Sequence, residues 1–199
     1  MTRPPRADAV RNRALLLAAA AAEFAEHGFE ASVADIARRA GVGKGTVFRH
    51  FPTKDDLVAA IVLDRITRLT ATAEELAAAD PGAALLEFLT TAARERQQLD
   101  LSFLQGQEGA EVAAARDGLF RAIDALVGRA REHGVVRADV TGTDVVLLMC
   151  VPNDAVRHLP DPPPDLWQRY LAIIFDGLRP EGAHPLPQPP PGHTTPATR

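Results

Sequence analysis

The stretch ADIARRAGVGKGTVFRHF, Ala34 to Phe51, combines two patterns that a single purpose does not explain. Its apolar residues recur at helical spacing, which predicts a face packed against a core. Between them stand cationic side chains, which a core does not need, and glycines, which permit a tight turn and a close approach of the backbone to a phosphate. The stretch therefore predicts a helix over 33–40, a turn at 41–43 and a second helix over 44–50, which together form a helix-turn-helix.

The two sets of residues have different roles in such a motif. The apolar set holds the two helices at a fixed angle, and the polar set points outward. A second helix of this kind lies in the major groove of DNA and reads base edges, while flanking cations neutralise phosphates. The alternative is an ordinary helical hairpin with a solvated basic face. The outward residues are Arg38, Arg39, Lys44, Thr46, Phe48, Arg49 and His50.

Composition places this motif in a globular helical protein. The chain has 199 residues, of which 46% are apolar and only 5% aromatic. That length is enough for one large or two small domains, and the abundant alanine favours helices. Residues 1–60 hold nine Lys/Arg and seven Asp/Glu, a net charge of +2, whereas residues 61–199 hold thirteen and nineteen, a net charge of −6. This uneven charge favours a polyanionic partner at one end of the chain.

Helix start and stop signals predict an all-α protein of about nine helices without strands. Caps are expected at Ser32, Thr53, Asp80 and Thr143, and Pro152 is expected to kink or end the helix that Thr143 starts. The boundaries predicted for the chain are a flexible basic arm (1–7), a three-helix helix-turn-helix domain (8–58, with the motif at 33–51), a C-terminal helical domain (59–179) and a proline-rich disordered tail (180–199).

Residues 10–58 resemble the DNA-binding domain of the TetR family of transcriptional regulators, through the run LLLAAAAAEFAEHGFEASVADIARRAGVGKGTVFRHFPTKDDL. The rest of the chain is similar to that family only in its helical architecture and in the phrase GVVRADVTGTDV. Phe48 stands where the family usually has tyrosine, so a hydrogen bond from a hydroxyl to phosphate is lost. Arg49 either reads a base or is solvated, and Arg3, Arg6 and Arg11 either follow the DNA or form a solubilising end. The DNA contacts that the resemblance implies are Arg38, Lys44, Gly45, Thr46, Phe48, Arg49, His50 and Lys54.

The resemblance also implies a ligand-responsive homodimeric repressor that binds a palindromic operator in double-stranded DNA. The expected effector is a hydrophobic or aromatic small molecule. Its expected pocket is lined by Phe88, Phe103, Phe120, Leu147 and Met149, although each of these residues also fits a plain core position. The expected contacts between subunits are Val145, Leu148, Trp167, Leu171 and Ile174. Two alternatives are an effector-independent activator or nucleoid-type protein, and a helical adaptor or enzyme that reuses the motif.

Catalytic and metal-binding motifs are not found in the sequence. GVGKGT lacks the spacing of a phosphate-binding loop and follows no strand. The six histidines show no Cys, Asp or Glu at metal-ligand spacing, so we expect no metal, no cofactor and no enzymatic activity. Cys150 is the single cysteine and is expected to be a buried small hydrophobe. No apolar run reaches the ~18–20 residues that span a bilayer, and no signal peptide is evident, so the expected location is the cytoplasm, away from membranes.

Overall fold

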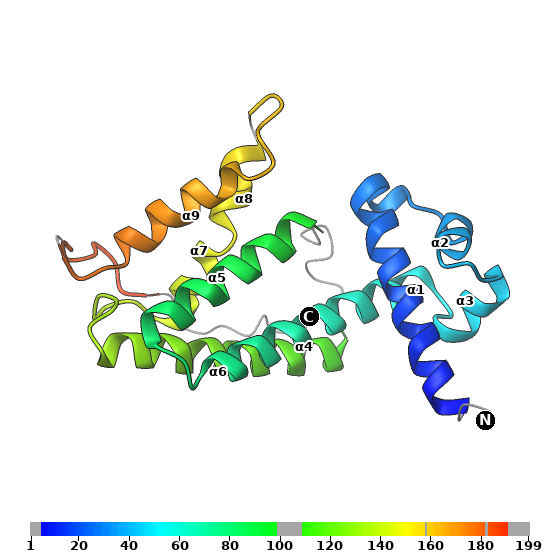
Figure 1. The fold of residues 1–199 in the computed structure, drawn as a ribbon, viewed down its shortest axis with the longest axis horizontal. Coiled ribbons are helices and arrows are strands. Elements are labelled where there is room, and N and C mark those ends of the chain that lie inside the picture. The colour runs from blue at the N-terminus through cyan, green and yellow to red at the C-terminus, as the bar shows by residue number, and fades with distance from the viewer. Residues whose placement is uncertain (1–4, 99–108, 158, 182, 191–199) are drawn as a thin grey trace. The chain divides into compact units, whose positions relative to one another are not determined.

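The computed structural model describes residues 5–98, 109–157, 159–181 and 183–190 (Figure 1). The described chain is helical throughout and contains no strand, which confirms the predicted fold class. It divides into two compact units, one built mainly from residues up to Arg65 and the other from Ile66–Gln97 and from Ala113 onward. The helices are α1 (Pro5–His27), the 3-10 turn η1 (Gly28–Glu30), α2 (Val33–Arg39), α3 (Lys44–His50), α4 (Lys54–Leu76), α5 (Pro81–Gln98), α6 (Ala110–Glu132), α7 (Gly142–Leu148), α8 (Val151–Arg157) and α9 (Leu166–Gly177).

The first unit packs α2 and α3 against α1 and the beginning of α4. The apolar stripe of α1 that recurs every four residues is fully buried, as predicted from its helical period. Ile36 and Val47, from α2 and α3, are at most 1% exposed. The remaining large core residues of this unit include Leu16, Phe24, Phe51, Leu57 and Ile61.

Three of the four predicted caps are confirmed. Ser32 Oγ accepts the Asp35 N–H at 3.2 Å, and Thr53 Oγ1 accepts the Asp56 N–H at 3.0 Å. Asp80 Oδ1 accepts the N–H groups of Gly82 and Ala83 at 3.1 and 3.0 Å, next to Pro81, where a missing N–H costs nothing. These caps begin α2, α4 and α5 at the positions that the sequence indicated.

The predicted cap at Thr143 is wrong. Thr141 caps α7, because its Oγ1 accepts the Asp144 N–H at 3.3 Å while Asp144 Oδ2 accepts the Thr141 N–H at 2.8 Å. This reciprocal arrangement satisfies two backbone donors at once, and Thr143 has no acidic residue three positions later with which to form it.

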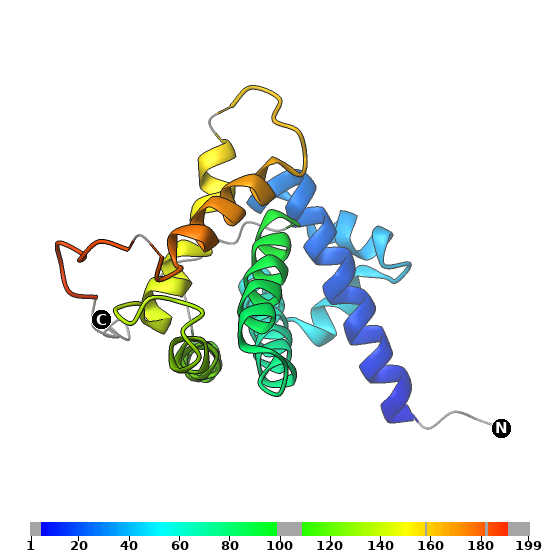
Figure 2. The same ribbon diagram turned by 60° about the vertical axis from the view of Figure 1, so that its left-hand side comes forward.

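Helix α7 ends before Pro152, as the missing N–H of proline predicts, and Pro152 itself lies in the first turn of α8. A single helix through this region would press the proline ring against the Leu148 carbonyl, and α7 ends at Leu148. The chain then forms α8, a helix that the sequence pattern did not indicate, and α8 packs along α9 in the second unit (Figures 1 and 2). Cys150 lies between α7 and α8 and is half-buried rather than buried, so the expectation for it is also corrected.

The second unit has its own core, which is formed by α5, α6, α7, α9 and the end of α4. Its most completely buried large side chains include Leu85, Phe88, Ile123, Val145 and Trp167, each at most 1% exposed. None of the helices in the described parts of the chain combines the length and the apolar character that crossing a bilayer requires.

The two ends of the chain were predicted to be a short arm and a proline-rich tail, and the helix at the N-terminal end begins earlier than expected. Helix α1 begins at Pro5, so it includes part of the predicted arm, and residues 1–4 lie outside the described residues. The described part of the tail, 183–190, has no helix, but Arg137 donates a hydrogen bond to the His184 carbonyl oxygen at its start. The guanidinium of Arg137 also holds the pKa of the Asp139 carboxyl below its usual value.

Candidate nucleic-acid interface

The turn between α2 and α3 is a Schellman motif centred on a glycine. The Gly41 N–H donates to the Arg38 carbonyl at 3.1 Å, and the Val42 N–H donates to the Ala37 carbonyl at 3.0 Å. Gly41 has a φ of +68°, a region that side chains with a Cβ rarely adopt. The turn therefore fixes the angle between the two helices through the backbone of a single residue.

Two alanine substitutions in this motif are expected to change stability in opposite directions. Gly41→Ala should lower the free energy of unfolding by roughly 1 kcal/mol, because the left-handed conformation strains any L-residue. Gly45→Ala, inside α3, should raise it by roughly 0.5–1 kcal/mol, because alanine is the better helix former. A Cβ at either position meets nothing within 4 Å, so contacts do not confuse the comparison. Urea denaturation of both variants measures the difference, and equal effects would contradict the assigned turn.

One side of α3 faces solvent and carries most of the expected DNA contacts. Lys44, Gly45, Phe48 and Arg49 are exposed, at positions that form one stripe of a helix, whereas Val47 points into the core. Phe48 is 48% exposed, which is unusual for a large aromatic side chain without a partner surface. The geometry therefore offers a helix face with two cations around an aromatic ring.

Three of the expected DNA contacts, Thr46, His50 and Lys54, are half-buried and lie beside the exposed face of α3. Thr46 and His50 are half-buried, and Thr46 Oγ1 accepts a hydrogen bond from Arg49 Nη2 at 3.2 Å. The ammonium of Lys54, in the first turn of α4, lies 5.6 Å from the centre of the Phe24 ring. The guanidinium of Arg13 lies 4.8 Å from the centre of the Phe51 ring in a similar way.

Arg38 and Arg39 are neighbours in sequence but differ in their surroundings. The Arg38 side chain is 76% exposed, and its Nη1 lies 2.6 Å from Asp35 Oδ1. The Ser32 hydroxyl, and after it Arg38, hold the pKa of the Asp35 carboxyl below its usual value. Arg38 thus remains on the surface as a candidate phosphate contact.

Arg39 instead joins the end of α2 to the end of α1. Its Nε lies 2.8 Å from Glu23 Oε1, and its Nη1 donates to Glu26 Oε1 at 2.8 Å. Glu23 is only 4% exposed, and Arg39 holds the pKa of the Glu26 carboxyl below its usual value. Arg39 is exposed, as expected, but its guanidinium is directed at two carboxylates of α1.

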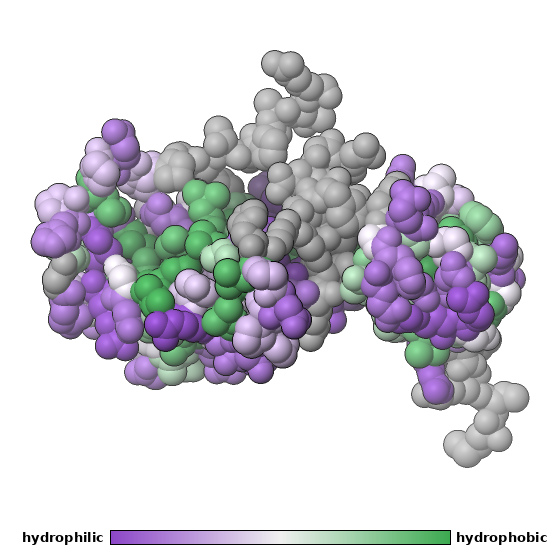
Figure 3. All heavy atoms as spheres, turned by 90° about the horizontal axis from the view of Figure 1, so that it is seen from above, coloured by the Kyte–Doolittle hydropathy of each residue, from purple (hydrophilic) through white to green (hydrophobic). Residues whose placement is uncertain are grey.

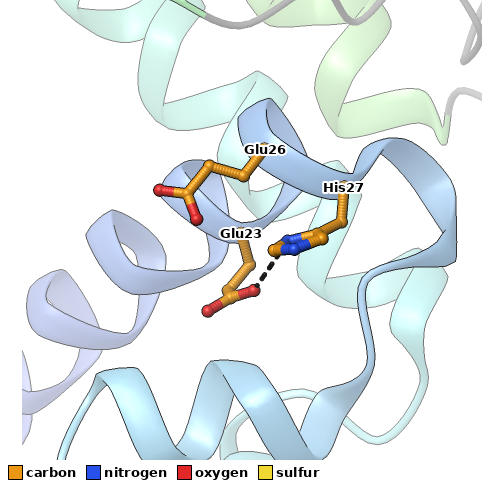
Figure 4. A group of neighbouring side chains, drawn as sticks. All are labelled: Glu23, Glu26 and His27. Carbon is orange, nitrogen blue, oxygen red and sulfur yellow. Dashed lines mark ion pairs between the residues drawn. The ribbon is translucent and has the colours of Figure 1, made fainter.

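Glu23 and Glu26 also form a close group with His27 (Figure 4). His27 Nδ1 points at Glu23 Oε2 from 3.2 Å, so the expectation that no histidine has an acidic neighbour at ligand spacing is wrong. The sequence signal was the four-residue separation on one helix face. Since Arg39 supplies positive charge to both carboxylates, the group forms an ion-pair network whose charges are met by protein side chains.

The residues expected to line an effector pocket are not gathered in one place. Phe88 is fully buried in the core of the second unit, and Met149 packs against that core. Leu147 is 56% exposed on α7, and Phe120 is half-buried on α6. Phe103 lies outside the described residues. The structure does hold a pocket of about 360 Å³ in this unit, between the start of α5 and the ends of α6 and α9, and none of the four described residues lines it.

Most of the residues expected to contact a second subunit are buried within a single chain instead. Val145, Trp167 and Leu171 are at most 4% exposed within a single chain, so they pack the core of the second unit. Leu148 and Ile174 are half-buried. The large apolar side chains that α7, α8 and α9 expose are Leu147, Val151 and Ile173, at 56, 44 and 54%. Figure 3 shows apolar surface on the second unit in the view from above.

Comparisons with known proteins cover both units. Residues 16–61 match the family described as bacterial regulatory proteins of the tetR family, and residues 80–180 match the C-terminal domain of SbtR-like transcriptional regulators. A TetR transcription regulatory protein from Mycobacterium vanbaalenii is 36% identical, with 88% of this chain and 99% of that chain covered and a TM-score of 0.68. The TetR regulator SCO0520 from Streptomyces coelicolor is 29% identical, with coverages of 84% and 98% and a TM-score of 0.67.

A curated relative adds a shorter match. The HTH-type transcriptional repressor Rv3405c of Mycobacterium tuberculosis is 48% identical over 68 residues, which is 34% of this chain and only 36% of the relative's length. The N-terminal match falls on the helix-turn-helix, and the C-terminal match falls on the second helical unit. On these matches and on the coverage of the Mycobacterium vanbaalenii structure, the chain belongs to the TetR family, whose members are transcriptional regulators rather than enzymes.

Proposed function

We propose that this chain is a sequence-specific DNA-binding transcriptional regulator, and that it acts as a homodimeric repressor released from a palindromic operator by a small molecule. The observation that carries the proposal is the exposed face of α3, where Lys44 and Arg49 flank Phe48 while Val47 anchors the helix from behind. In this proposal residues 8–58 form the DNA-binding domain, and residues 59–179 bind the effector and the second subunit. The name of the relative Rv3405c, a transcriptional repressor, supports the sign of regulation.

The contacts to DNA divide into two kinds. Lys44, Gly45 and Arg49 would approach base edges, because they lie at the start and on the open side of the recognition helix. Arg38, His50 and Lys54 would meet phosphates. Phe48 has no hydroxyl to donate, so it would pack on sugar or thymine methyl groups. Two such faces in a dimer would read half-sites about 34–36 Å apart.

The effector would act through α4, which begins in the first unit and ends in the second. A ligand bound in the second unit would favour one arrangement of this helix and thereby change the spacing of the two reading heads. By linkage, the ligand must weaken operator affinity by the same factor by which the operator weakens ligand affinity.

The test is a selection of bound duplexes from a random DNA library with the purified full chain, followed by a salt titration of the best sequence. An inverted repeat whose affinity falls steeply with salt is expected, with a slope of about 0.9 per neutralised phosphate. Failure to enrich any inverted repeat would count against a dimeric sequence reader.

Two substitutions would separate phosphate contacts from base reading. Lys54→Ala should weaken binding to every sequence alike and reduce the salt slope by about 1. Arg49→Ala should cost about 1–3 kcal/mol and relax specificity at a single operator position. Repeating the selection with each variant provides the measurement. Uniform weakening by Arg49→Ala would make that residue a phosphate contact instead.

A further inference from the structure

Among the buried side-chain polar atoms without a hydrogen-bond partner in the described parts of the chain, three lie on three different helices of the second unit. These atoms are Arg96 Nε on α5, Asn153 Oδ1 on α8 and Trp167 Nε1 on α9. Proteins pair nearly all such groups, because an unpaired buried donor or acceptor has lost its hydration without compensation. Such atoms are expected where a ligand or an ordered water completes the structure.

Arg96 and Asn153 come together where α5 meets α8. Asn153 Nδ2 donates to the Ala93 carbonyl at 3.0 Å, which fixes the amide, because the reverse orientation would set two oxygens against each other. Arg96 lies three residues after Ala93, on the same face of α5. Its Nη2 lies 3.8 Å from Asp154 Oδ1, so the α8 carboxylate faces the guanidinium.

Trp167 reaches the same end of the unit from α9. Gln97 donates to the Pro164 carbonyl, which holds the chain just before α9 to the end of α5. Trp167 follows three residues later, is 1% exposed and belongs to the same core cluster as Ala93. The indole N–H and the Arg96 Nε–H are therefore donors, and Asn153 Oδ1 is an acceptor, on three helices joined by these contacts.

We infer that the effector is a neutral molecule that presents a carbonyl oxygen to the N–H groups of Arg96 and Trp167, and a hydroxyl or N–H group to Asn153. A carboxylate fits less well, because Asp154 already faces the charge of Arg96 and would repel a second anion. This inference rests on the proposed regulation by a small molecule. It replaces a purely hydrophobic effector with one that has a polar head.

Trp167 provides the readout, because it is the only tryptophan of the chain. In protein labelled with ¹⁵N-tryptophan, the single indole N–H signal should lie upfield, as for an unbonded donor, and should move downfield when salicylamide or 3-hydroxyoctanamide saturates the site. The matched anions salicylate and 3-hydroxyoctanoate should bind more weakly, and so should the phenol o-cresol and the alcohol 3-octanol, in which a methyl group replaces the amide.

A substitution tests the second donor without removing the reporter. Arg96→Lys keeps the charge opposite Asp154 but lacks Nε–H, so it should weaken binding of the two amides about three- to tenfold. Arg94→Lys, at an exposed position of the same helix, is the control and should leave their affinity unchanged.

Several outcomes would overturn the inference. An indole signal that is already downfield and does not respond would mean that an ordered water holds the N–H. Stronger binding of the anions would exclude a neutral effector. Binding of the hydroxyl compounds as tight as that of the amides would show that the ligand does not use the buried polar atoms. No response of the indole signal to either amide would show that these atoms do not form a binding site. A protein that selects an operator but shows none of these shifts would support the DNA-binding proposal and contradict the effector site. A protein that shows the shifts but selects no operator would support the effector site and contradict the DNA-binding proposal.

Discussion

Ile173→Glu is expected to convert the proposed dimer into a monomer and to lower affinity for the proposed operator by about 10³-fold. Ile173 is 54% exposed on α9, so a single folded chain loses little when the side chain becomes charged. A dimer would instead bury that charge opposite its own copy, which is costly without a partner. Specific operator binding is typically at least ~10³ tighter than non-specific binding, and a monomer with one reading head would approach the non-specific level.

The measurements are sedimentation velocity, circular dichroism and operator titration. The expected pattern is a monomer with an unchanged helical spectrum and weak DNA binding, whose unfolding transition no longer depends on subunit concentration. Leu186→Glu is the matched control, because Leu186 is 46% exposed in the same unit but lies outside the helices α7 to α9. A dimeric Ile173→Glu protein with full operator affinity would move the interface away from this face.

Leu147→Glu extends the same test to α7, where the side chain is 56% exposed.

The apolar pattern of α9 shows why the exposed apolar residues of this face could not be chosen from the sequence. Trp167, Leu171 and Phe175 repeat every four residues and are buried in the chain, while Ile173 lies on another side of the same helix. Helical periodicity identifies an apolar stripe but does not tell whether the stripe meets its own core or a second subunit.

Local chemistry made the helix-turn-helix predictable. The hydroxyl of Ser32 and the flexibility of Gly41 act on backbone groups within a few residues, so their effects can be read from the chain itself. The same reasoning failed between Thr141 and Thr143, where two candidate caps stand close together and only the acidic residue three positions later distinguishes them. Helix α8 was not predicted as a separate helix, because Pro152 was expected to kink or end the helix before it, although proline fits well in a first turn.

Long-range pairing made the functional residues harder to assign. Arg38 and Arg39 differ by one position, which rotates a side chain by about 100° around a helix. That rotation places one at the surface and directs the other to Glu23 and Glu26, thirteen or more residues earlier in the chain. The buried atoms of Asn153 and Trp167 are similarly invisible in the sequence, because their lack of a partner is a property of three packed helices.

Arg39→Gln should lower operator affinity by about tenfold on every sequence without changing the salt slope. Residues that do not touch a ligand can alter its binding to this extent when they hold a contacting element in place. Arg39 binds the buried Glu23 and the exposed Glu26 of α1, so its loss frees the end of α2 and tilts the helix-turn-helix. The number of phosphates neutralised stays the same, because the guanidinium is paired with two carboxylates of α1.

Arg38→Gln is the matched control from the adjacent, 76% exposed position. If Arg38 meets a phosphate, its variant should reduce the salt slope by about 1 and leave thermal stability nearly unchanged. Arg39→Gln is therefore expected to lower thermal stability and to leave the salt dependence of DNA binding unchanged. Arg38→Gln is expected to leave thermal stability unchanged and to reduce the salt dependence of DNA binding. A smaller slope for Arg39→Gln would show that Arg39 leaves Glu23 and Glu26 when DNA binds.

Acid titration adds an independent readout of the Arg39 network. Because Arg39 lowers the pKa of Glu26 in the folded chain, this pair stabilises the fold above the pKa that Glu26 has when unfolded, and the stabilisation is lost as pH falls through the lower, folded value. Arg39→Gln should remove that contribution, so the difference in unfolding temperature between wild type and variant should shrink as the solution is acidified below the usual range of a glutamate pKa. A difference that stays constant into strong acid would mean that Arg39 stabilises the fold by packing rather than by its charge, and the end of α2 would then be held by contacts other than these ion pairs.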